Sequence, residues 1–470
     1  MSGAPSKATG AATAPGRTRE HPLWLLRDAR RARKQGPAAI ERRQRARLAG
    51  MVAFACANSP YYRKLYRDLP EKIEDPTLLP ITSKKALMAR FDDWATDREV
   101  TIEKARAFVE NPDLIGERFL GRYTLLTTSG TTGNRRIFVL DDRSMAVTSA
   151  LVFRMLSAWL GIGDVIGILA GGGRMAMVNA MGGHFASAVA ATRLRGKRVQ
   201  VFPVDMPLPE MVAQLNRFRP VIVASYASMA ALLAGEREAG RLRIDPVLVV
   251  LSAEGLPARE YDRIAGAFDA KVRDSYAATE CPFISYRCEH GWLHVNSDWL
   301  VLEPVDADHR PVAPGKHSHT VLLTNLANRV QPIIRYDLGD SILQRPDPCS
   351  CGNTLPAIRV QGRAADVLAF PIGGERVTIP PLAFGSLVDR TPGVELFQIV
   401  QTAPASLRVR LHPAAGADPE RVWRMVHDEI THLLAGNGLD HVTVERAGEP
   451  PEQSAGGKYR TIIPLNSGGS

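Results

Sequence analysis

The sequence lacks any uninterrupted run of about 18 apolar residues, so it predicts no transmembrane helix. Residues 1–20 also lack the apolar segment of a secretory signal, and their alanine, glycine, serine and threonine content predicts a disordered leader. We therefore expect a cytoplasmic protein without a membrane partner. Five cysteines in such a chain do not indicate a disulfide framework, and the sequence has no internal repeat.

Excess positive charge is confined to one end of the chain. The net charge is +10 over 470 residues. Residues 1–50 contain twelve Lys or Arg against three Asp or Glu, so the other 420 residues carry only about +1. A basic segment without interleaved aromatic residues or a nucleic-acid module is typical of a solvated helix face. We therefore expect no nucleic-acid partner.

The length and the hydrophobic pattern predict an α/β protein of at least two domains. Between residues 120 and 276, β-rich runs alternate with helical patterns, which favours a largely parallel sheet. The expected strands are YTLLTT, VIGILA, VQVFPVD, VIVASYA, VLVVLS and VRDSY, and the expected helices include 38–56, 144–160 and 207–218. After residue 290, strands with few helices indicate an antiparallel or barrel-like portion.

The last hundred residues have a pattern of their own. VELFQIVQ (394–401) and LRVRLHP (407–413) alternate as strands, a helix follows with Asp418 as N-cap, and HVTVERA (441–447) is a further strand. We therefore expect a large domain of layered α/β subdomains with the barrel-like portion over residues 21–361. Residues 362–470 would form a small, mobile α+β domain.

The sharpest motif is YTLLTTSGTTGNRR, residues 123–136. An apolar strand leads into a turn whose glycines and hydroxyl side chains can offer backbone N–H and O–H donors to an anion. The turn is not a Walker A loop, because it has no Gly-Lys-Ser/Thr sequence. By itself it fits an ordinary loop as well as a phosphate site. The candidate residues are Thr128, Ser129, Gly130, Thr131, Thr132 and Gly133.

Five further segments follow in an order that resembles the adenylate-forming superfamily of acyl-CoA ligases, adenylation domains and luciferases. They are SAEG (252–255), SYAATE (275–280), RYDLGD (335–340), QGRAAD (361–366) and GGKYR (456–460). Within the superfamily, NSPYYRKLY, ITSKKAL, GWLHVNSDWLVLEP and QPIIRYDLGD resemble the phenylacetate–CoA ligase branch and its relatives that adenylylate a deazaflavin coenzyme. The resemblance covers nearly the whole chain after residue 20.

The resemblance implies ATP and Mg²⁺ as cofactors and gives each matched segment a role. Thr128–Gly133 would hold the β- and γ-phosphates, Tyr276 would lie against adenine, and Asp340 and Arg363 would bind the ribose. Thr279 would contact the α-phosphate, Glu280 would ligate magnesium, and Lys458 would neutralise charge between the carboxylate and the α-phosphate. The adenine segment adds Ala253, Glu254, Gly255 and Ala277.

Two departures from the superfamily pattern are visible. The loop is followed by Asn134, Arg135 and Arg136 in place of a basic residue and proline, and Ala365 replaces the first aspartate of the hinge. In the superfamily this hinge serves a domain rotation between adenylation and thioester formation. MGGHFA (181–186) resembles the segment beside the acid pocket, which would place His184 and Phe185 there. A helix start that packs on the sheet is an equal alternative for these residues.

The implied function is a ligase that adenylates an aryl or similar carboxylic acid and passes the acyl group to CoA. One alternative is transfer of AMP or the acyl group to a hydroxyl or amine, for which Ala365 would matter less. The other is a degenerate nucleotide-binding scaffold, against which Glu280, Asp340, Arg363 and Lys458 argue. The oligomeric state stays open, with a homodimer as one option.

The cysteines suggest a second metal. Cys349 and Cys351 lie on a Pro- and Gly-rich turn, and RCEHGWLH upstream supplies Cys288 and His294. Two pairs of soft ligands suit tetrahedral zinc, and relatives in the phenylacetate-ligase branch carry a similar cluster. We therefore expect one structural Zn²⁺, with Cys281 and His290 as reserve ligands and small buried thiols as the alternative.

Overall fold

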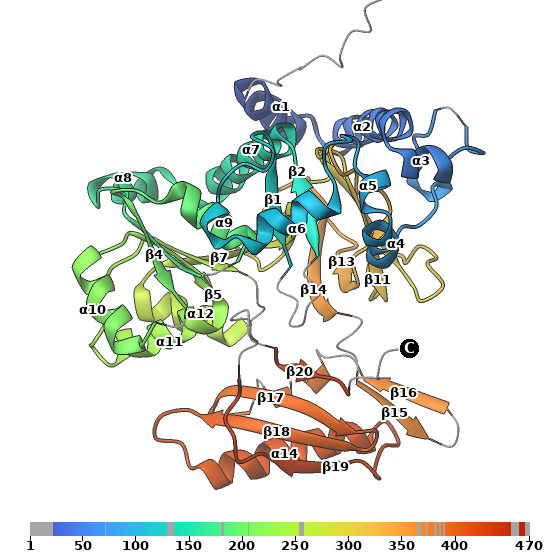
Figure 1. Ribbon diagram of the computed structural model, residues 1–470. Coiled ribbons are helices and arrows are strands. Elements are labelled where there is room, and N and C mark those ends of the chain that lie inside the picture. The colour runs from blue at the N-terminus through green and yellow to red at the C-terminus, as the bar shows by residue number, and fades with distance from the viewer. Residues whose placement is uncertain are drawn as a thin grey trace, which may run out of the picture.

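The computed structural model describes most of the chain and divides it into a large N-terminal part and a smaller C-terminal part (Figure 1). The described residues are 22–70, 72–128, 136–179, 183–204, 206–252, 258–363, 368–372, 375–379, 383–384, 387–388, 391–452 and 460–465. The predicted leader, residues 1–20, lies outside them.

Helices come first among the described residues; α1 to α5 lie along the top and right of the large part, and α6 lies near its middle (Figure 1). They are α1 (Pro22–Gln35), α2 (Pro37–Asn58), α3 (Pro60–Leu65), η1 (Pro76–Leu78), α4 (Lys84–Ala89), α5 (Phe91–Trp94), α6 (Ile102–Glu110) and η2 (Pro112–Leu114). The predicted helix 38–56 is confirmed, because α2 buries Leu48, Met51, Val52 and Ala55 at the expected helical spacing.

A nine-stranded sheet forms the centre, in the order β13-β14-β9-β8-β7-β6-β5-β3-β4. Its parallel half comprises β3 (Met175–Asn179), β4 (Val199–Pro203), β5 (Ile222–Tyr226), β6 (Leu248–Ser252) and β7 (Lys271–Ala278). From β7 onward neighbours are antiparallel, through β8 (Cys281–Arg287), β9 (Leu293–Val295), β14 (Ala357–Arg363) and β13 (Asp340–Gln344). The change from parallel to antiparallel strands therefore occurs at β7, inside one continuous sheet.

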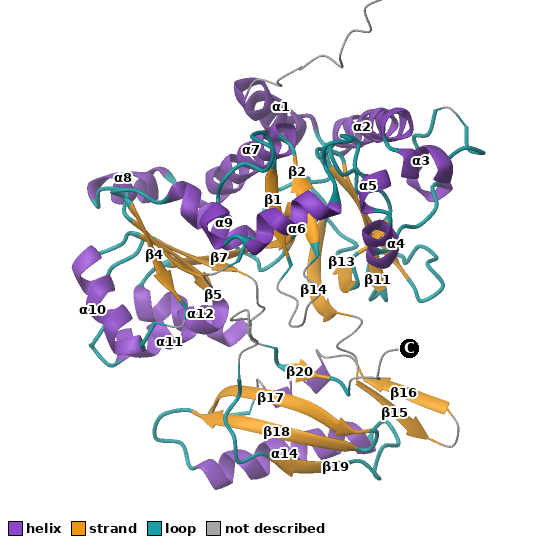
Figure 2. Ribbon diagram, viewed as in Figure 1, coloured by secondary structure: helices purple, strands orange, loops and turns teal. Residues whose placement is uncertain are grey.

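Helices cover the sheet, and two smaller sheets complete the large part (Figure 2). The helices are α7 (Asp142–Trp159), α8 (Ile162–Ala170), α9 (Ala186–Leu194), α10 (Leu208–Phe218), α11 (Ala227–Glu238) and α12 (Ala258–Phe268). In the first of the smaller sheets, β1 (Thr124–Thr127) pairs with β2 (Ile137–Leu140). In the second, β11 (Thr320–Asn325) lies between β10 (Leu300–Val305) and β12 (Tyr336–Asp337).

The strand expected at VIGILA is wrong, because these residues belong to helix α8. The Asp164 carboxylate accepts a hydrogen bond of 2.6 Å from the Gly161 N–H, which fixes the start of a helix. A short apolar run is compatible with either element, and here the N-terminal cap decides. Among the described helices none is by itself long and apolar enough to cross a bilayer; α7 and α8 pass that test only as a pair bent by 106°.

The C-terminal part has its own hydrophobic core. The expected β-β-α-β unit is present as β17, β18, α14 and β19, and three further strands accompany it. Its elements are β15 (Leu368–Ile372), β16 (Glu375–Ile379), β17 (Val394–Ala403), β18 (Ser406–Pro413), α14 (Pro419–Ala435), β19 (Thr443–Arg446) and β20 (Ile462–Ile463). The Asp418 side chain accepts from the Glu420 N–H, so the predicted N-cap is confirmed. The predicted domain boundary lies near the end of β14.

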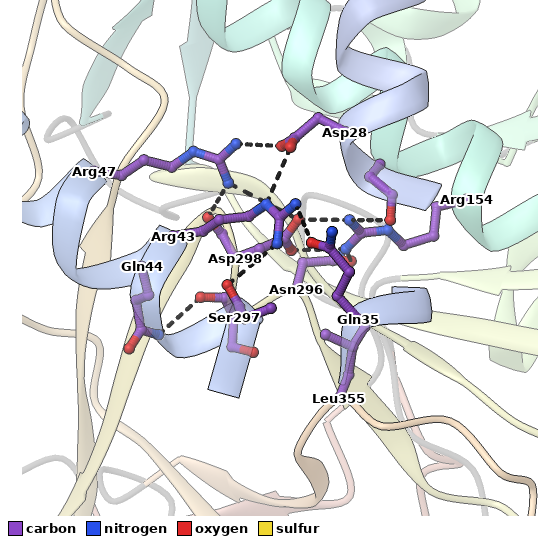
Figure 3. A network of polar contacts seen from close by, with 12 residues as sticks. Asp28, Gln35, Arg43, Gln44, Arg47, Arg154, Asn296, Ser297, Asp298 and Leu355 are labelled. Atoms are coloured by element: carbon purple, nitrogen blue, oxygen red, sulfur yellow. Dashed lines mark hydrogen bonds and ion pairs between the residues drawn. The ribbon is translucent and has the colours of Figure 1, made fainter. Parts of the chain in front are cut away.

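A buried ionic network joins the N-terminal helices to the large sheet (Figure 3). Two oxygens of Asp298, which is fully buried, accept from the Arg154 guanidinium at 2.8 and 2.6 Å. Arg47 of α2 donates to Asp28 of α1 at 2.5 Å and lies 3.9 Å from Asp298. The network therefore ties α1, α2 and α7 to the segment between β9 and β10.

Removing one partner of a buried ion pair leaves the other charge uncompensated. We therefore expect Asp298→Ala to lower the free energy of unfolding of the large part by about 3–5 kcal/mol. Urea unfolding measures this loss. Asp68→Ala is the control, because Asp68 forms an exposed pair with Arg67 and should change stability by less than about 1 kcal/mol. Equal losses in the two variants would contradict the role of the network.

Candidate active site

The predicted site residues divide into those that the structure describes and those outside it. Thr128, His184, Phe185, Tyr276, Ala277, Thr279, Glu280 and Asp340 are described, as are all four predicted zinc ligands. Ser129–Gly133, Ala253–Gly255, Lys458 and Ala365 lie outside the described residues, and of Arg363 only the backbone is described. The roles predicted for these residues stay predictions.

Strands β1 and β2, which precede and follow the predicted phosphate loop in the sequence, form an antiparallel pair. Strands β1 and β2 are buried along their whole length, with Thr127 opposite Ile137. One step further, the Thr128 N–H donates to the Arg136 carbonyl oxygen at 3.0 Å. The N–H of Val139 on β2 donates to the side-chain oxygen of Gln331 at 2.7 Å, which anchors the two strands to the large part. The two ends of the loop segment are therefore held together on a buried base.

The residues predicted to bind adenine and ribose converge. The hydroxyl of Tyr276 on β7 donates to Asp340 Oδ2 on β13 at 2.5 Å. Asp340 also lies directly opposite Arg363 in the antiparallel pair of β13 and β14. Gly339, with φ of 78°, supplies the left-handed turn that starts β13. Three segments far apart in the sequence thus present a phenol, a carboxylate and an arginine position at one place.

Glu280 is buried in a polar cluster at the turn after β7. Its Oε1 accepts from the Tyr336 hydroxyl at 2.7 Å and lies 3.6 Å from Lys84 Nζ. Burial, followed by the charge of Glu280, raises the pKa of Tyr336 well above its usual range, so this hydroxyl stays protonated and donates. A carboxylate has two oxygens, so Glu280 can keep these contacts through Oε1 and still offer Oε2 to a cation.

Lys84, which lies beside Glu280, is a residue that the motif analysis did not identify. It stands in ITSKKAL, which carried the finer resemblance, and it begins α4 after the N-cap Ser83. Nothing in the local pattern distinguishes Lys84 from the exposed Lys85 beside it. Only the tertiary fold brings one of them to Glu280, almost 200 residues later in the chain.

His184 links three elements of the large part. The ring is buried, packs on Phe108 of α6 at 5.3 Å between centroids, and has Nε2 3.4 Å from the carbonyl oxygen of Asn111. The His184 carbonyl oxygen accepts from the Thr127 N–H at the end of β1. Phe185 is the N-cap residue of α9. These contacts favour the alternative of a helix start packed on the fold for His184, while the acid-pocket assignment stays a prediction.

The four predicted zinc ligands form a compact cluster. The ligand atoms of Cys288, His294, Cys349 and Cys351 all lie within 4.8 Å of one another. The sulfurs of Cys288 and Cys349 are 3.8 Å apart, and Cys351 Sγ is 3.2 Å from His294 Nε2. Two sulfurs on one tetrahedral zinc with Zn–S bonds of about 2.3 Å are separated by roughly 3.8 Å. The donor set and its spacing therefore suit Zn²⁺.

The surroundings of the cluster also suit a metal. His294 Nδ1 lies 3.0 Å from the carbonyl oxygen of Leu355, which makes Nδ1 the donor and leaves Nε2 to face the thiols. Burial, with the nearby thiols of Cys349 and Cys288, raises the pKa of Cys351 to about 12, so a bound cation has to displace that proton. The two residues expected as reserve ligands lie outside the cluster: Cys281 packs in the main core, and His290 pairs with Glu289.

Comparison with known proteins identifies the fold. No protein-family model and no curated protein sequence matches the chain. Among solved structures, 2-hydroxyisobutyryl-CoA ligase in the postadenylation state with R3-HIB-AMP is 21% identical, with 91% of this chain and 89% of that chain covered and a TM-score of 0.64.

Two further solved structures also match the chain. The same ligase with 2-HIB-AMP and CoA in the thioesterification state gives 22% identity, coverage of 93% and 91%, and a TM-score of 0.54. The anthranilate CoA ligase AuaEII with anthranoyl-AMP gives 18% identity, coverage of 71% and 64%, and a TM-score of 0.51. The chain therefore has the fold of the adenylate-forming CoA ligases, as its motifs predicted.

Proposed function

We propose that the protein is an AMP-forming acid–CoA ligase. In the first half-reaction a carboxylate oxygen attacks the α-phosphorus of ATP, the bond to the β-phosphate bridging oxygen breaks, and pyrophosphate leaves. In the second, the CoA sulfur attacks the acyl carbon and AMP leaves. The observation that carries this proposal is the convergence of Tyr276, Asp340 and the backbone of Arg363 in a chain with the fold of such ligases.

The nucleotide fits this convergence. The Asp340 carboxylate can accept two hydrogen bonds from a vicinal diol, which is the recognition that a ribose requires. The Tyr276 hydroxyl orients that carboxylate through its 2.5 Å hydrogen bond, while the ring offers a face for adenine. The loop 128–133, with its ends held by β1 and β2, would supply donors to the phosphates, and Thr279 would donate to the α-phosphate.

Magnesium and a lysine would balance the charge of the phosphates. Glu280 is the residue that would hold Mg²⁺, which when bound neutralises charge on the leaving pyrophosphate. Lys84 places a second positive charge beside the same carboxylate at 3.6 Å. Lys458 would act from the C-terminal part, where its charge matters most as the α-phosphorus is attacked.

The finer assignment rests on resemblance. We propose a phenylacetate–CoA ligase-like enzyme that acts on an aryl or similar acid, because four segments outside the ATP motifs resemble that branch. Phe185 would border the acid pocket, with the preceding His184 packed on Phe108. CoA is the proposed acceptor, supported by the solved ligase with 2-HIB-AMP and CoA, which matches over 93% of this chain.

The function is tested by measuring pyrophosphate release over a library of carboxylic acids, with and without CoA. We expect slow acid-dependent release without CoA, because the acyl-adenylate stays bound, and multiple turnovers with CoA. Turnover only with an amine or alcohol acceptor would favour the alternative transferase, for which Ala365 is the motivating residue. Nucleotide binding without pyrophosphate release for any acid would favour the scaffold.

We expect Lys458→Ala to reduce acid-dependent ATP–pyrophosphate exchange by a few hundredfold, or about 2.7–4 kcal/mol, with little change in ATP affinity. The reason is that its charge acts mainly in the transition state. Lys316→Ala is the control, since Lys316 is exposed. Unchanged exchange in Lys458→Ala would rule out the role.

For magnesium, we expect Glu280→Gln to raise the Mg²⁺ concentration needed for half-maximal turnover by at least about tenfold, because a neutral amide is a poorer ligand. Titration of activity with MgCl₂ at saturating ATP measures the change. Glu289→Gln removes an exposed carboxylate instead and should leave the titration unchanged. If both variants titrate like the unmodified protein, Glu280 is not a magnesium ligand.

We further propose that Cys288, His294, Cys349 and Cys351 hold one structural Zn²⁺. The cluster would fasten the end of β8 and strand β9 to the segment between β13 and β14, in the antiparallel half of the large sheet. Four protein ligands leave no open position, so the metal would have no catalytic role.

Protein purified without chelator should contain one zinc per chain by elemental analysis. Cys349→Ser should lose most of this zinc and unfold at a lower temperature, whereas Cys56→Ser, which changes a cysteine outside the cluster, should keep both properties. Well under one zinc per chain, or unchanged thermal stability of Cys349→Ser in the presence of a chelator, would contradict the zinc site.

A further inference from the structure

Helix α8 presents its apolar side to solvent. Ile162, Val165, Ile166 and Leu169 follow the spacing i, i+3, i+4 and i+7, and they are 83%, 43%, 61% and 69% exposed. Such a stripe normally faces the core of a globular protein. In α8 no residue is buried. We call these four side chains the α8 ridge.

The inner side of α8 explains why the ridge stays outside. Gly167 and Gly171 face the body, where a Cβ on Gly167 would lie 3.3 Å from Val247 Cγ2 and one on Gly171 would collide with Val221. The only charged residue of the helix, Asp164, pairs with Lys271 at 2.5 Å. Rotation of α8 would push larger side chains into the space that these glycines fit. The ridge is therefore fixed in an outward position.

Basic residues border the C-terminal end of α8. Arg174 NH1 and Arg198 Cδ lie 3.1 and 4.0 Å from the Cβ positions of Gly172 and Gly173, in the turn after the helix. The Arg174 guanidinium donates to the carbonyl oxygen of Arg219, and Lys197 precedes Arg198. Near the amino ends of the strands beside α8, Asp164 and Asp245 pair with Lys271 and Arg237, and Asp269 before β7 is exposed. The border is therefore positively charged.

We propose that the α8 ridge and its basic border dock on the surface of a membrane with anionic headgroups. Aliphatic side chains at this spacing can enter the headgroup and acyl boundary to a depth of about 5–10 Å, while arginines contact lipid phosphates. This is attachment at the surface, so it departs from our expectation of no membrane partner, which rested on the absence of a membrane-spanning run.

A second copy of the chain fits the ridge less well. Nine residues of helix are only about 13 Å long, whereas a stable interface buries roughly 800 Å² per partner. Two-fold pairing through the ridge would also bring two positively charged borders together. Anionic lipid complements both the apolar stripe and the charge.

The position of α8 leaves the candidate active site accessible. Val221 and Val247, which face the glycines of α8, immediately precede β5 and β6, so the helix lies at the amino ends of the parallel strands. Tyr276 and Glu280 lie at the carboxyl end of β7. In Figure 1, α8 is at the upper left of the large part, and the C-terminal sheet is at the bottom. The docking surface does not depend on the proposed ligase activity.

Co-sedimentation of the full chain with vesicles tests the proposal. We expect binding to vesicles of phosphatidylcholine with phosphatidylglycerol, and much weaker binding to phosphatidylcholine alone. The double variant Ile166→Ser, Leu169→Ser should bind the anionic vesicles at least about tenfold more weakly. Leu78→Ser, Ile81→Ser makes the same change at exposed residues elsewhere and should bind normally. Arg198→Glu should weaken binding and reduce its dependence on salt.

Two further measurements keep the test decisive. Thermal unfolding should be unchanged in the ridge variant, because its side chains are exposed. Since α1 and α2 are also basic, binding by the unmodified protein alone does not support the ridge; loss in the ridge variant does. No binding to anionic vesicles, or equal binding by the ridge variant, would overturn the proposal. A dimer in analytical ultracentrifugation that the ridge variant abolishes would also overturn it, in favour of a second copy.

Discussion

The hydrogen bond between Tyr276 and Asp340 is the contact on which the candidate active site depends. It joins β7, the last parallel strand of the nine-stranded sheet, to β13 at the antiparallel edge. Parallel strands present their carboxyl ends together, and the antiparallel strands β8, β9, β14 and β13 continue the same sheet beyond β7. The Tyr276 hydroxyl fixes the Asp340 carboxylate at this junction, with Arg363 opposite on β14. The same turn of chain after β7 carries Glu280 into its cluster with Tyr336 and Lys84.

Among the described residues, Arg259 connects the large part to the C-terminal part. Arg259 of α12 follows the predicted adenine segment in the sequence, and its guanidinium donates to the carbonyl oxygens of Thr391 and Val394 at 3.4 and 2.9 Å. The C-terminal part, which has its own core, is therefore linked to helix α12 of the large part. The fold matches the postadenylation state of 2-hydroxyisobutyryl-CoA ligase better than the thioesterification state of the same ligase, with TM-scores of 0.64 and 0.54.

Local pattern predicted much of the fold. Helical spacing identified α2, the caps identified α14, and alternation identified β17 and β18. Local pattern failed at α8, because six apolar residues suit a strand as well as a helix and the stripe there faces solvent instead of the core. The residues that keep this stripe on the outside, Val221 and Val247, lie 50 or more residues further along the chain.

The site was predicted from resemblance more than from spacing. Ordered motifs named Tyr276 and Asp340, but only the sheet shows that they touch. Lys84 was missed because its contact with Glu280 spans almost 200 residues and leaves no local signal. The cysteine cluster was predicted from ligand chemistry. The structure shows that Cys281 is not part of it, because Cys281 lies in the core.

The central claim is that Asp340, oriented by Tyr276, binds the ribose of the nucleotide. Calorimetric titration with AMP and with 2′-deoxy-AMP tests it most directly, because a site built to bind a hydroxyl rejects the analogue that lacks it. We predict that the unmodified protein binds AMP at least about tenfold more tightly than 2′-deoxy-AMP, and that Asp340→Ala binds the two nucleotides equally. Equal binding by the unmodified protein, or undiminished preference for AMP in Asp340→Ala, would contradict the account.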